Sequence, residues 1–539
     1  MQKEIFFDRN YYLELLSKHV RDFTEGYRQN LSFIGEEMVG KTSLILHFLN
    51  KFNDNRILPI YMPIKKEGTR FFAERFMTCL VYGFLNNSGI ELKEDLNYLI
   101  SNAEKFIPHT VAKIREIRHI IRKNKTSIFL ELLSLCDVIN KETKKFCLVI
   151  FDEFHNLEEI GIKNLYRDWA KVLVLQKNTM FIIISSSKFK AKRILTINLN
   201  LLFGKFELIE IEPFDYKTAK EFLLDRLNGL MLENKLIDFL VILTGGIPFY
   251  LNVIADSIYK MKDQLYLDRY INKDTIFDIL TELLFKETGT LNQRFSNYLN
   301  KVSAKDMDKN LLKVILSISN GYNRIKDISQ NLHIQRRNIL KLIHQLLEID
   351  MITKNGDLFK INDRLFNLWL KLVYQKKLLS PEFNPQIQLQ MFRKELENTY
   401  NEFLDSSNKS LLERVMEIMY LFEDAYVNID NKRIDLTVFR EIKPFYLESS
   451  GINEGLIARS ADNLWIVAIK QNPLREEDIE EFSRFCNKHR QKKQKRIVIT
   501  LHQIDTNVRL KAMEERILTW ELKNLNLLCE LFNRTVIIG

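Results

Sequence analysis

The sequence predicts an α/β fold for residues 1–215, with a parallel sheet that helices cover on both faces. Three observations indicate this fold: five compact apolar runs are separated by helical segments, a glycine-rich segment follows the first run, and an acidic pair follows the third. Continuous apolar strands are typical of parallel sheets, because a strand with helices on both faces buries every side chain. The predicted strands are residues 30–35, 57–64, 146–151, 180–185 and 206–212.

Length and composition favour several folded domains. The chain has 539 residues, 46% of them hydrophobic, with only 17 Gly and 9 Pro, so we expect no long disordered tract. Residues 70–145 and 216–300 show mainly helical periodicity, whereas residues 401–539 mix helices with strands.

Charge and cysteine content narrow the class of protein. The net charge of +10 favours an anionic partner such as nucleic acid, although frequent Lys, Ile and Asn would also follow from an AT-rich coding sequence. Five scattered cysteines without a CxxC pair predict neither a disulfide framework nor a cysteine metal site. The N-terminus lacks the apolar core of a signal peptide, and no stretch approaches about 18 uncharged apolar residues. We therefore expect a cytoplasmic protein with no membrane partner.

The segment GEEMVGKT, residues 35–42, fits the phosphate-binding pattern GxxxxGK[ST] at every fixed position. Its glycines let backbone amides curl around phosphate oxygens, Lys41 reaches the β- and γ-phosphates, and Thr42 ligates Mg²⁺. A predicted strand precedes the segment and a predicted helix follows it, as this pattern requires. The sequence therefore predicts ATP and Mg²⁺ as cofactors, held by Gly35, Glu36, Glu37, Met38, Val39, Gly40, Lys41, Thr42 and Ser43.

An acidic pair, Asp152 and Glu153, follows the third predicted strand. Asp152 is placed to organise Mg²⁺ together with Thr42, and Glu153 to polarise an attacking water. The alternative is an ordinary acidic pair that caps a helix. The serines that end the fourth strand offer Ser186 as a catalytic hydroxyl near the γ-phosphate, although serines also commonly end strands.

The order of these elements resembles the archaeal-type ATPases within the AAA+ and STAND group of P-loop proteins. Phe7 and Arg9 match the opening F-x-R motif of that family, although Asn10 stands where an acidic residue is usual. The segments GEEMVGKT and DEFHN match its Walker motifs, the serine run its sensor, and TGGIPFYL its G-G-x-P-x-Y signature. This resemblance covers about residues 5–300. It implies the strand order 5-1-4-3-2, a helical lid, and nucleotide contacts from Arg9 and Pro248.

One departure from the family concerns the element before the fifth strand. Lys205 stands where the family usually has arginine. Lysine is a point charge rather than a planar fork, so it cannot grip a phosphate with two parallel hydrogen bonds. If that arginine assists hydrolysis in the family, turnover in this chain is expected to be slow. Arg193 is a candidate replacement, or else an ordinary surface residue.

Residues 301–365 predict a winged helix-turn-helix. Three helical segments are followed by a hairpin signal, Asn355-Gly356, for which we expect a type I′ turn. The third helix carries Arg336, Arg337 and Lys341 on its polar side, and these side chains are suited to phosphates and base edges of double-stranded DNA. The alternative is a module for protein interaction, with a basic face that is merely solvated.

The last part of the chain loosely resembles restriction nucleases of the PD-(D/E)xK type. Residues 454–474 look like the two core strands of that fold, with Lys470 in the lysine position. However, Ala468 and Gly455 replace the two metal-binding acids, and the neighbouring Glu454 points to the opposite face of its strand. Asn401 also replaces an acid in the preceding helix. We therefore expect a degenerate domain that binds rather than cuts.

The densest basic run, residues 487–496, is either a second surface for a phosphate backbone or a solvated helix end. We expect five parts in the chain: the ATPase domain (1–215), the helical lid (216–300), the winged helix (301–365), a helical linker (366–400) and the nuclease-like domain (401–539). The main hypothesis is a switch ATPase that couples its nucleotide state to DNA or to a protein partner, with self-association left open. The alternatives are an ATP-dependent nuclease and a protein-interaction regulator that does not bind nucleic acid.

Overall fold

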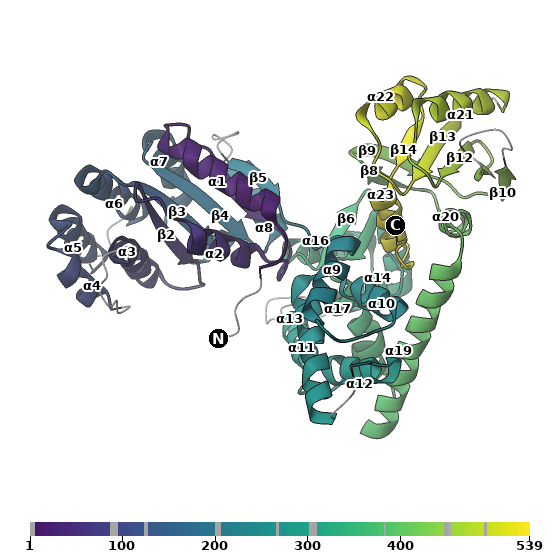
Figure 1. Ribbon diagram of the computed structural model, residues 1–539, viewed down its shortest axis with the longest axis horizontal. Helices are drawn as coiled ribbons and strands as arrows, with labels where there is room; N and C mark the ends of the chain where they lie inside the picture. The colour runs from purple at the N-terminus through teal and green to yellow at the C-terminus, as the bar shows by residue number, and fades with distance from the viewer. Residues whose placement is uncertain are drawn as a thin grey trace. The chain divides into compact units, whose positions relative to one another are not determined.

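The computed structural model describes residues 6–86, 95–122, 128–199, 206–265, 269–300, 310–381, 384–446, 452, 454–489 and 493–538. The chain divides into two compact units (Figure 1). The first unit contains residues up to 222 together with 246–250, and the second contains residues 223–245 together with those from 251 onward. The five-part division expected from the sequence stays a prediction.

A parallel sheet forms the centre of the first unit. Its strands lie in the order β2-β3-β4-β1-β5, and every neighbouring pair is parallel. This order, read from the opposite edge, is the expected 5-1-4-3-2. The strands are β1 (Asn30–Ile34), β2 (Ile57–Pro63), β3 (Phe146–Asp152), β4 (Thr179–Ser185) and β5 (Phe206–Glu210).

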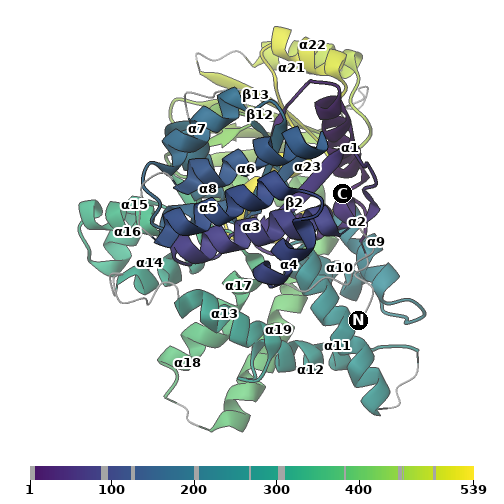
Figure 2. The same cartoon turned by 90° about the vertical axis from the view of Figure 1, so that its left-hand side faces the viewer.

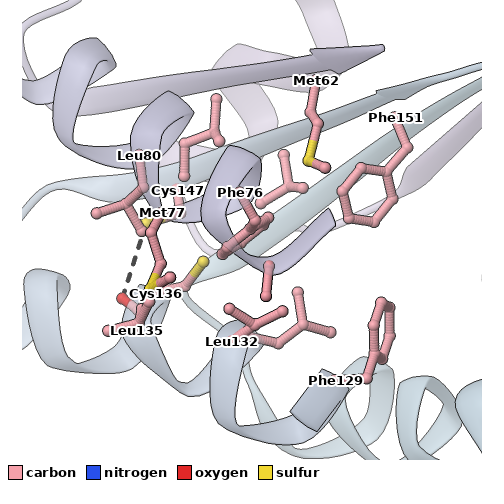
Figure 3. Packing of buried hydrophobic residues seen from close by; sticks show 14 of the residues in the cluster. Met62, Phe76, Met77, Leu80, Phe129, Leu132, Leu135, Cys136, Cys147 and Phe151 are labelled. Carbon is pink, nitrogen blue, oxygen red and sulfur yellow. Dashed lines mark hydrogen bonds between the residues drawn. The ribbon is translucent and has the colours of Figure 1, made fainter. Parts of the chain in front are cut away.

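Helices cover both faces of this sheet, as the continuous apolar strands predict. Along β3, Leu148 and Ile150 pack into one core, whereas Val149 and Phe151 pack into the other. The first core includes α1 (Asn10–Thr24) and α2 (Lys41–Lys51). The second core is larger, and Figure 3 shows part of its packing, while Figure 2 views the helices on that side of the sheet. The second core includes α3 (Thr69–Leu85), α4 (Leu96–Ala103), α5 (Pro108–Arg122), α6 (Ile128–Thr143) and α7 (Leu165–Leu175).

Short elements at the carboxyl ends of the strands complete the first unit. The 3-10 helix η1 (Phe154–Glu159) follows β3 directly, and α8 (Lys188–Arg193) with the π-helix η2 (Ile194–Asn198) follows β4. All of these connections leave the sheet at the same edge, where parallel α/β folds bind their ligands. α9 (Tyr216–Arg226) begins in the first unit and ends in the second.

The second unit begins with helices. Aromatic contacts link the long helix α19 (Pro385–Asn408) to the others: Tyr400 packs against Phe239 and Phe277, and Phe392 stacks on Phe285. The remaining helices are α10 (Asn234–Thr244), α11 (Pro248–Leu265), whose first turn belongs to the first unit, α12 (Lys273–Leu284), α13 (Thr290–Asn300), α17 (Arg364–Trp369), the π-helix η4 (Leu370–Gln375) and α18 (Lys376–Leu379).

The helices and the hairpin of the expected winged helix are present between residues 310 and 361. The helices are α14 (Asn310–Ser319), α15 (Ile325–Leu332) and α16 (Arg336–Glu348), and the hairpin pairs β6 (Ile352–Asn355) with β7 (Leu358–Ile361). On α16, the apolar face is buried as its spacing predicts, through Ile339, Leu342, Ile343 and Leu346. The candidate boundary at residues 301–306 lies outside the described residues.

The turn of this hairpin differs from the expected type I′ turn. Asn355 pairs with Leu358, so the two turn residues are Gly356 and Asp357, and of these only Gly356 has a positive φ, +62°. A type I′ turn needs positive φ at both central residues, whereas glycine at the first position alone is typical of type II′. The type I′ prediction is therefore wrong. The tip packs on another strand, because a Cβ at Gly356 would collide with the carbonyl oxygen of Tyr426.

The last part of the second unit has a mixed five-stranded sheet. β10 (Glu441–Tyr446), β11 (Glu454–Arg459) and β12 (Leu464–Lys470) are antiparallel, and β13 (Gln494–Thr500) and β14 (Leu518–Trp520) extend the sheet in parallel. A separate hairpin pairs β8 (Ala425–Ile429) with β9 (Lys432–Leu436). The helices of this part are α20 (Leu411–Tyr420), α21 (Glu476–Lys488), α22 (Thr506–Glu514) and α23 (Leu522–Leu531).

The described helices also bear on the expectation about membranes. None of them combines the length and the apolar character that a bilayer crossing requires. All five cysteines of the chain are free thiols in the structure.

Candidate nucleotide-binding site

The segment 35–42 connects β1 to α2 at the carboxyl edge of the first sheet. Two of its residues have positive φ: Met38 at +65° and Gly40 at +96°. A Cβ at Gly35 would collide with the carbonyl oxygen of Ile211, so only glycine fits at the start of the loop. The loop therefore curls tightly before α2 begins at Lys41, and it directs backbone amides inward.

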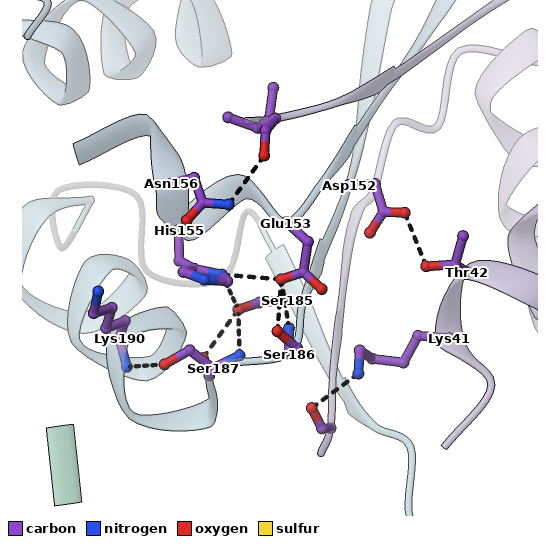
Figure 4. Close-up of polar contacts among 12 residues, drawn as sticks. Lys41, Thr42, Asp152, Glu153, His155, Asn156, Ser185, Ser186, Ser187 and Lys190 are labelled. Atoms are coloured by element: carbon purple, nitrogen blue, oxygen red, sulfur yellow. Dashed lines mark hydrogen bonds and ion pairs between the residues drawn. The ribbon is translucent and has the colours of Figure 1, made fainter. Parts of the chain in front are cut away.

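Lys41 is held inside this loop. Its side chain is 5% exposed, and Nζ donates to the carbonyl oxygens of Gly35 at 3.0 Å and Glu36 at 2.5 Å (Figure 4). Burial lowers the pKa of Lys41, and the nearby carboxylates of Glu153 and Asp152 oppose this shift. The ammonium group thus lies under the loop that would surround a phosphate chain.

Asp152 ends β3 beside Thr42. The Thr42 hydroxyl donates to Asp152 Oδ2 at 2.9 Å, and the Tyr61 hydroxyl donates to the same oxygen at 2.7 Å. The other oxygen, Asp152 Oδ1, is buried and has no hydrogen-bond partner among the residues that the structure describes. Carboxylate and hydroxyl oxygens are the ligands that Mg²⁺ prefers, so the residues present fit a divalent cation. Tyr61 was not singled out in the sequence, because only the pairing of β2 with β3 brings it to Asp152.

Glu153 adopts a left-handed backbone conformation, φ +55°, directly after β3. Its Oε2 atom accepts hydrogen bonds from the Ser186 backbone N–H at 3.0 Å and from the Ser186 hydroxyl at 2.8 Å (Figure 4). Burial raises the pKa of Glu153, and the hydrogen bonds from Ser186 oppose the shift. The structure therefore brings the predicted Glu153 and Ser186 together. The hydroxyl hydrogen of Ser186 is directed at Glu153 in this arrangement.

His155 is a further member of the site that the sequence reasoning missed. Its Nδ1 atom lies 3.2 Å from Glu153 Oε2 and 2.8 Å from the Ser185 hydroxyl oxygen. Burial lowers the pKa of His155 to about 4, with Lys190 and Lys66 adding to the shift, so the imidazole is neutral at pH 7. The only sequence signal is a histidine two positions after the candidate base, which does not by itself specify contact.

Arg9 connects the loop to the end of the fifth strand. Its Nη2 atom donates to the carbonyl oxygens of Glu212 at 2.7 Å and Val39 at 3.3 Å, and its guanidinium lies 4.7 Å from the centre of the Phe214 ring. Burial lowers the pKa of Arg9. In this structure Arg9 therefore stabilises the loop by donating hydrogen bonds to backbone carbonyl oxygens.

The other predicted ligands are spread around the loop. Val39 is buried in the core beneath it, Glu36 lies 3.5 Å from Lys188, and Ser43 is exposed on α2. Glu37 is half-buried. Pro248 is the first residue of α11 and is half-buried.

The Gly-Gly motif before Pro248 packs tightly. The Phe214 backbone N–H donates to the Gly246 carbonyl at 3.0 Å, and a Cβ at Gly246, φ +72°, would collide with the Phe214 carbonyl oxygen.

Arg193 forms an ion pair with Glu158 at 2.7 Å. Lys205, which stands where the family has arginine, lies outside the described residues.

The predicted DNA-contacting residues lie on the exposed face of α16. Arg336, Arg337 and Lys341 are all exposed, and Leu340 beside them is 51% exposed.

The hairpin that follows α16 is fixed at its tip by two pairs of hydrogen bonds. Asn355 exchanges hydrogen bonds with Asn428, at 3.0 and 2.6 Å. Asp357 exchanges hydrogen bonds with Tyr426, at 2.9 and 3.1 Å.

Gly455 and Ala468, which stand where the resemblance to nucleases would require metal-binding acids, lie side by side in the sheet of the second unit. Gly455 pairs with Ala468 across β11 and β12, and a Cβ at Gly455 would collide with the Val467 carbonyl oxygen and the Phe445 ring. Lys470 is buried and forms an ion pair with Asp478 at 3.1 Å. In the part of the chain that the structure describes, no three His, Cys, Asp or Glu side chains gather into a cluster suited to a metal.

The basic run at residues 487–496 is partly engaged within its own domain. Arg496 donates to Asn487 at 2.9 Å and to Gln494, and Lys495 lies 4.7 Å from the centre of the Trp465 ring. Burial lowers the pKa of Lys495. Residues 490–492 lie outside the described residues. The run therefore offers fewer free cations than its composition indicates.

Comparison with known protein families gives a match mainly to the first unit. Residues 6–254 match the model of a family described as an ATPase domain that occurs predominantly in Archaea. The match covers less than half of the chain and contains the loop, Asp152, Glu153 and Pro248. A search of curated proteins found no match.

Several solved structures are similar to part of this chain. A Walker-type ATPase of Pyrococcus abyssi is 19% identical, with 68% of this chain and 97% of that chain covered and a TM-score of 0.47. The ORC2 protein of Aeropyrum pernix, solved as ADPNP–ADP complexes, is 11% identical over 70% and 98% of the two chains, with a TM-score of 0.44. The ORC1 protein of Aeropyrum pernix in complex with DNA is 12% identical over 70% and 95%, with a TM-score of 0.37.

Proposed function

We propose that residues 6–254, which match the model of an ATPase domain family, bind ATP and form the driving part of a molecular switch. The observation that carries the proposal is the convergence of the loop, Asp152 and Glu153 at one edge of the sheet. Such convergence would bring a phosphate cradle, a cation site and a base to one edge of the sheet.

The loop amides and Lys41 would hold the phosphate chain, and Thr42 with Asp152 would hold Mg²⁺. The unpartnered, buried Asp152 Oδ1 supports this role, since a buried carboxylate oxygen without a hydrogen bond is costly unless a cation or water occupies its lone pairs. When bound, Mg²⁺ supplies positive charge that stabilises the phosphate oxygens during transfer.

Glu153 would act as the base for hydrolysis. Its carboxylate takes a proton from a water molecule as the water oxygen bonds to the γ-phosphorus. The bond from the γ-phosphorus to the bridging oxygen breaks, and its electron pair leaves with ADP. The burial that raises the pKa of Glu153 supports this role, because a carboxylate with a raised pKa is a stronger base. Lys205 in place of the usual arginine supports slow turnover.

The nucleotide state would control binding of double-stranded DNA through α16. Three exposed cations on one helix face and the net charge of +10 support this partner. The exposed Leu340 on the same face favours a protein partner instead, which is the second candidate. The engaged Lys470 and the crowded Gly455 argue against DNA cleavage as the outcome. A cytoplasmic location and self-association remain predictions.

ATP turnover by the purified full-length chain tests the proposal. Lys41→Ala should lose ATP binding, because the loop then lacks its phosphate-facing charge. Glu153→Gln should bind ATP with unchanged affinity but lose at least about a hundredfold in turnover, because an amide cannot accept the proton. Both variants and the wild type are measured with and without duplex DNA. Equal turnover in all three proteins would refute the assignment of both residues.

A further inference from the structure

The two carboxylate oxygens of Glu153 have different surroundings. Oε2 accepts both hydrogen bonds from Ser186 and also faces His155 Nδ1 at 3.2 Å. The hydrogen bonds and the close histidine contact that the structure gives Glu153 within the described residues all involve Oε2, which leaves Oε1 without a hydrogen bond to them. Oε2 is thus held by hydrogen bonds, and Oε1 can still accept one.

The tautomer of His155 follows from its neighbours. Glu153 Oε2 accepts both hydrogen bonds from Ser186, and the Ser185 hydroxyl lies within hydrogen-bond distance of the Ser187 carbonyl oxygen, at 3.0 Å, to which it can donate. An ionised carboxylate can only accept, so Nδ1 can bond to Glu153 only as a donor, and we assign the hydrogen to Nδ1. Since the imidazole is neutral, its Nε2 atom is bare.

The orientation of the His155 ring is fixed from two strands. Ser185 ends β4 and is fully buried, and its hydroxyl oxygen also accepts a hydrogen bond from the Ser187 backbone N–H at 3.0 Å. The helix η1 that carries His155 is tied to the residue that follows β2, because the Asn156 side chain donates to the Ile64 carbonyl at 3.0 Å (Figure 4). The ring can therefore donate to Glu153 without having to be ordered at the moment of reaction.

We propose that His155 is a positioning residue, whose Nδ1–H together with Ser186 clamps Glu153 Oε2 so that Oε1 faces the attacking water. The inference rests on the proposed role of Glu153 as the base. Ser186 contacts Oε2 from the end of β4, and His155 contacts it from the turn after β3. With both donors present, the carboxyl group cannot rotate about its terminal bond. Loss of His155 leaves one side of the carboxylate unrestrained, and even small misplacement of a base lowers the rate.

Two substitutions at His155 test whether its N–H donor or only its volume matters for hydrolysis. In His155→Asn, the amide nitrogen takes nearly the place of Nδ1 and can still donate, whereas His155→Phe fills a similar volume without a donor. We expect His155→Phe to lower the single-turnover rate of ATP hydrolysis at least tenfold, with ATP affinity within threefold of wild type. His155→Asn should restore the rate to within threefold of wild type.

Three outcomes would overturn the inference. An unchanged rate in His155→Phe would show that the clamp is dispensable, and equal losses in His155→Phe and His155→Asn would show that the donor is not what matters. A parallel loss of ATP affinity and thermal stability in His155→Phe, with no rescue by asparagine, would assign the residue to folding alone.

The double variant with Glu153→Gln separates this inference from the proposed function. If His155 acts only through Glu153, adding His155→Phe to Glu153→Gln should cause no further loss of rate, since the group being positioned is already disabled. If Glu153→Gln turns over ATP as wild type does, the base itself is misassigned and the proposed function fails. If Glu153→Gln is inactive and His155→Phe is not, only the clamp fails.

Discussion

At the scale of single residues, the site depends on how neighbouring strands orient Asp152. Thr42 and Tyr61 both donate to Oδ2, from α2 and β2 respectively, and Oδ1 has no hydrogen-bond partner within the described part of the chain. Burial raises the pKa of Tyr61, and Asp152 adds to the shift, so the phenol keeps its proton and stays a donor. Partners of this kind orient the groups that bind a metal and tune its affinity.

We predict that Tyr61→Phe raises the Mg²⁺ concentration for half-maximal ATP hydrolysis by about tenfold, because Asp152 then has one donor fewer to orient it. A Mg²⁺ titration of the hydrolysis rate at saturating ATP measures this shift. Tyr82→Phe, which alters an exposed tyrosine on α3, is the matched control and should leave the titration unchanged. A titration of Tyr61→Phe that overlays that of wild type would contradict the role given to Tyr61.

The residues around Glu153 show which members of the site a sequence can predict and which it cannot. GEEMVGKT and the acidic pair are contiguous patterns, so their residues could be named from spacing alone. The contact between His155 and Glu153 depends on a left-handed residue after β3 and on the serines that end β4, which is its neighbour in the sheet. No pattern in the sequence predicts that His155, Glu153 and the serines at the end of β4 come into contact. The same is true of Tyr61, which reaches Asp152 only through strand pairing.

At the scale of elements, apolar runs locate strands well but do not determine how elements dock. The five strands of the first sheet begin and end within two residues of the apolar runs that predict them. The hairpin of residues 352–361 is also found, yet the expected turn type is wrong, because Gly356 and Asp357 form the turn in place of Asn355 and Gly356. Gly356 also packs against Tyr426 on β8, a contact that a local turn signal does not encode.

The docked hairpin affects how residues 310–361 would contact the proposed DNA partner. Its tip is bonded to β8 through Asn355 and Asp357, and Lys360 on β7 pairs with Glu530 of α23. A hairpin fixed in this way cannot enter a groove without losing those bonds. Within the described residues, the side chains of Arg336, Arg337 and Lys341 form no hydrogen bond or ion pair, so the exposed face of α16 can approach a phosphate backbone.

We predict that replacing both Arg336 and Arg337 with alanine weakens binding to duplex DNA by about tenfold or more in moderate salt. The slope of log affinity against log salt should also become shallower by about one for each phosphate that the variant no longer neutralises. Fluorescence anisotropy with a labelled duplex at several salt concentrations measures both quantities. Lys354→Ala removes an exposed cation from β6 and should weaken binding no more than twofold. If the wild type binds no duplex in a salt-dependent manner, DNA is not the partner of α16.

At the scale of the whole molecule, the chain passes between its two units more than once. Residues 246–250, which include the first turn of α11, belong to the first unit, whereas α10 and the rest of α11 belong to the second. The Phe214–Gly246 hydrogen bond fixes this short segment to the chain that follows β5. A rearrangement at the nucleotide site therefore has a covalent route into the second unit, along a continuous helix.

Such a route makes a quantitative prediction, because coupling between two ligands is reciprocal. If ATP changes the affinity for duplex DNA by some factor, DNA must change the affinity for ATP by the same factor, and couplings of about fivefold to 150-fold are typical. We expect both measured factors to agree and to exceed fivefold in Glu153→Gln, which holds ATP without turning it over. ATP should leave DNA affinity unchanged in Lys41→Ala. If Glu153→Gln binds DNA equally well with and without ATP, the two ligands are uncoupled and the ATPase domain does not drive α16.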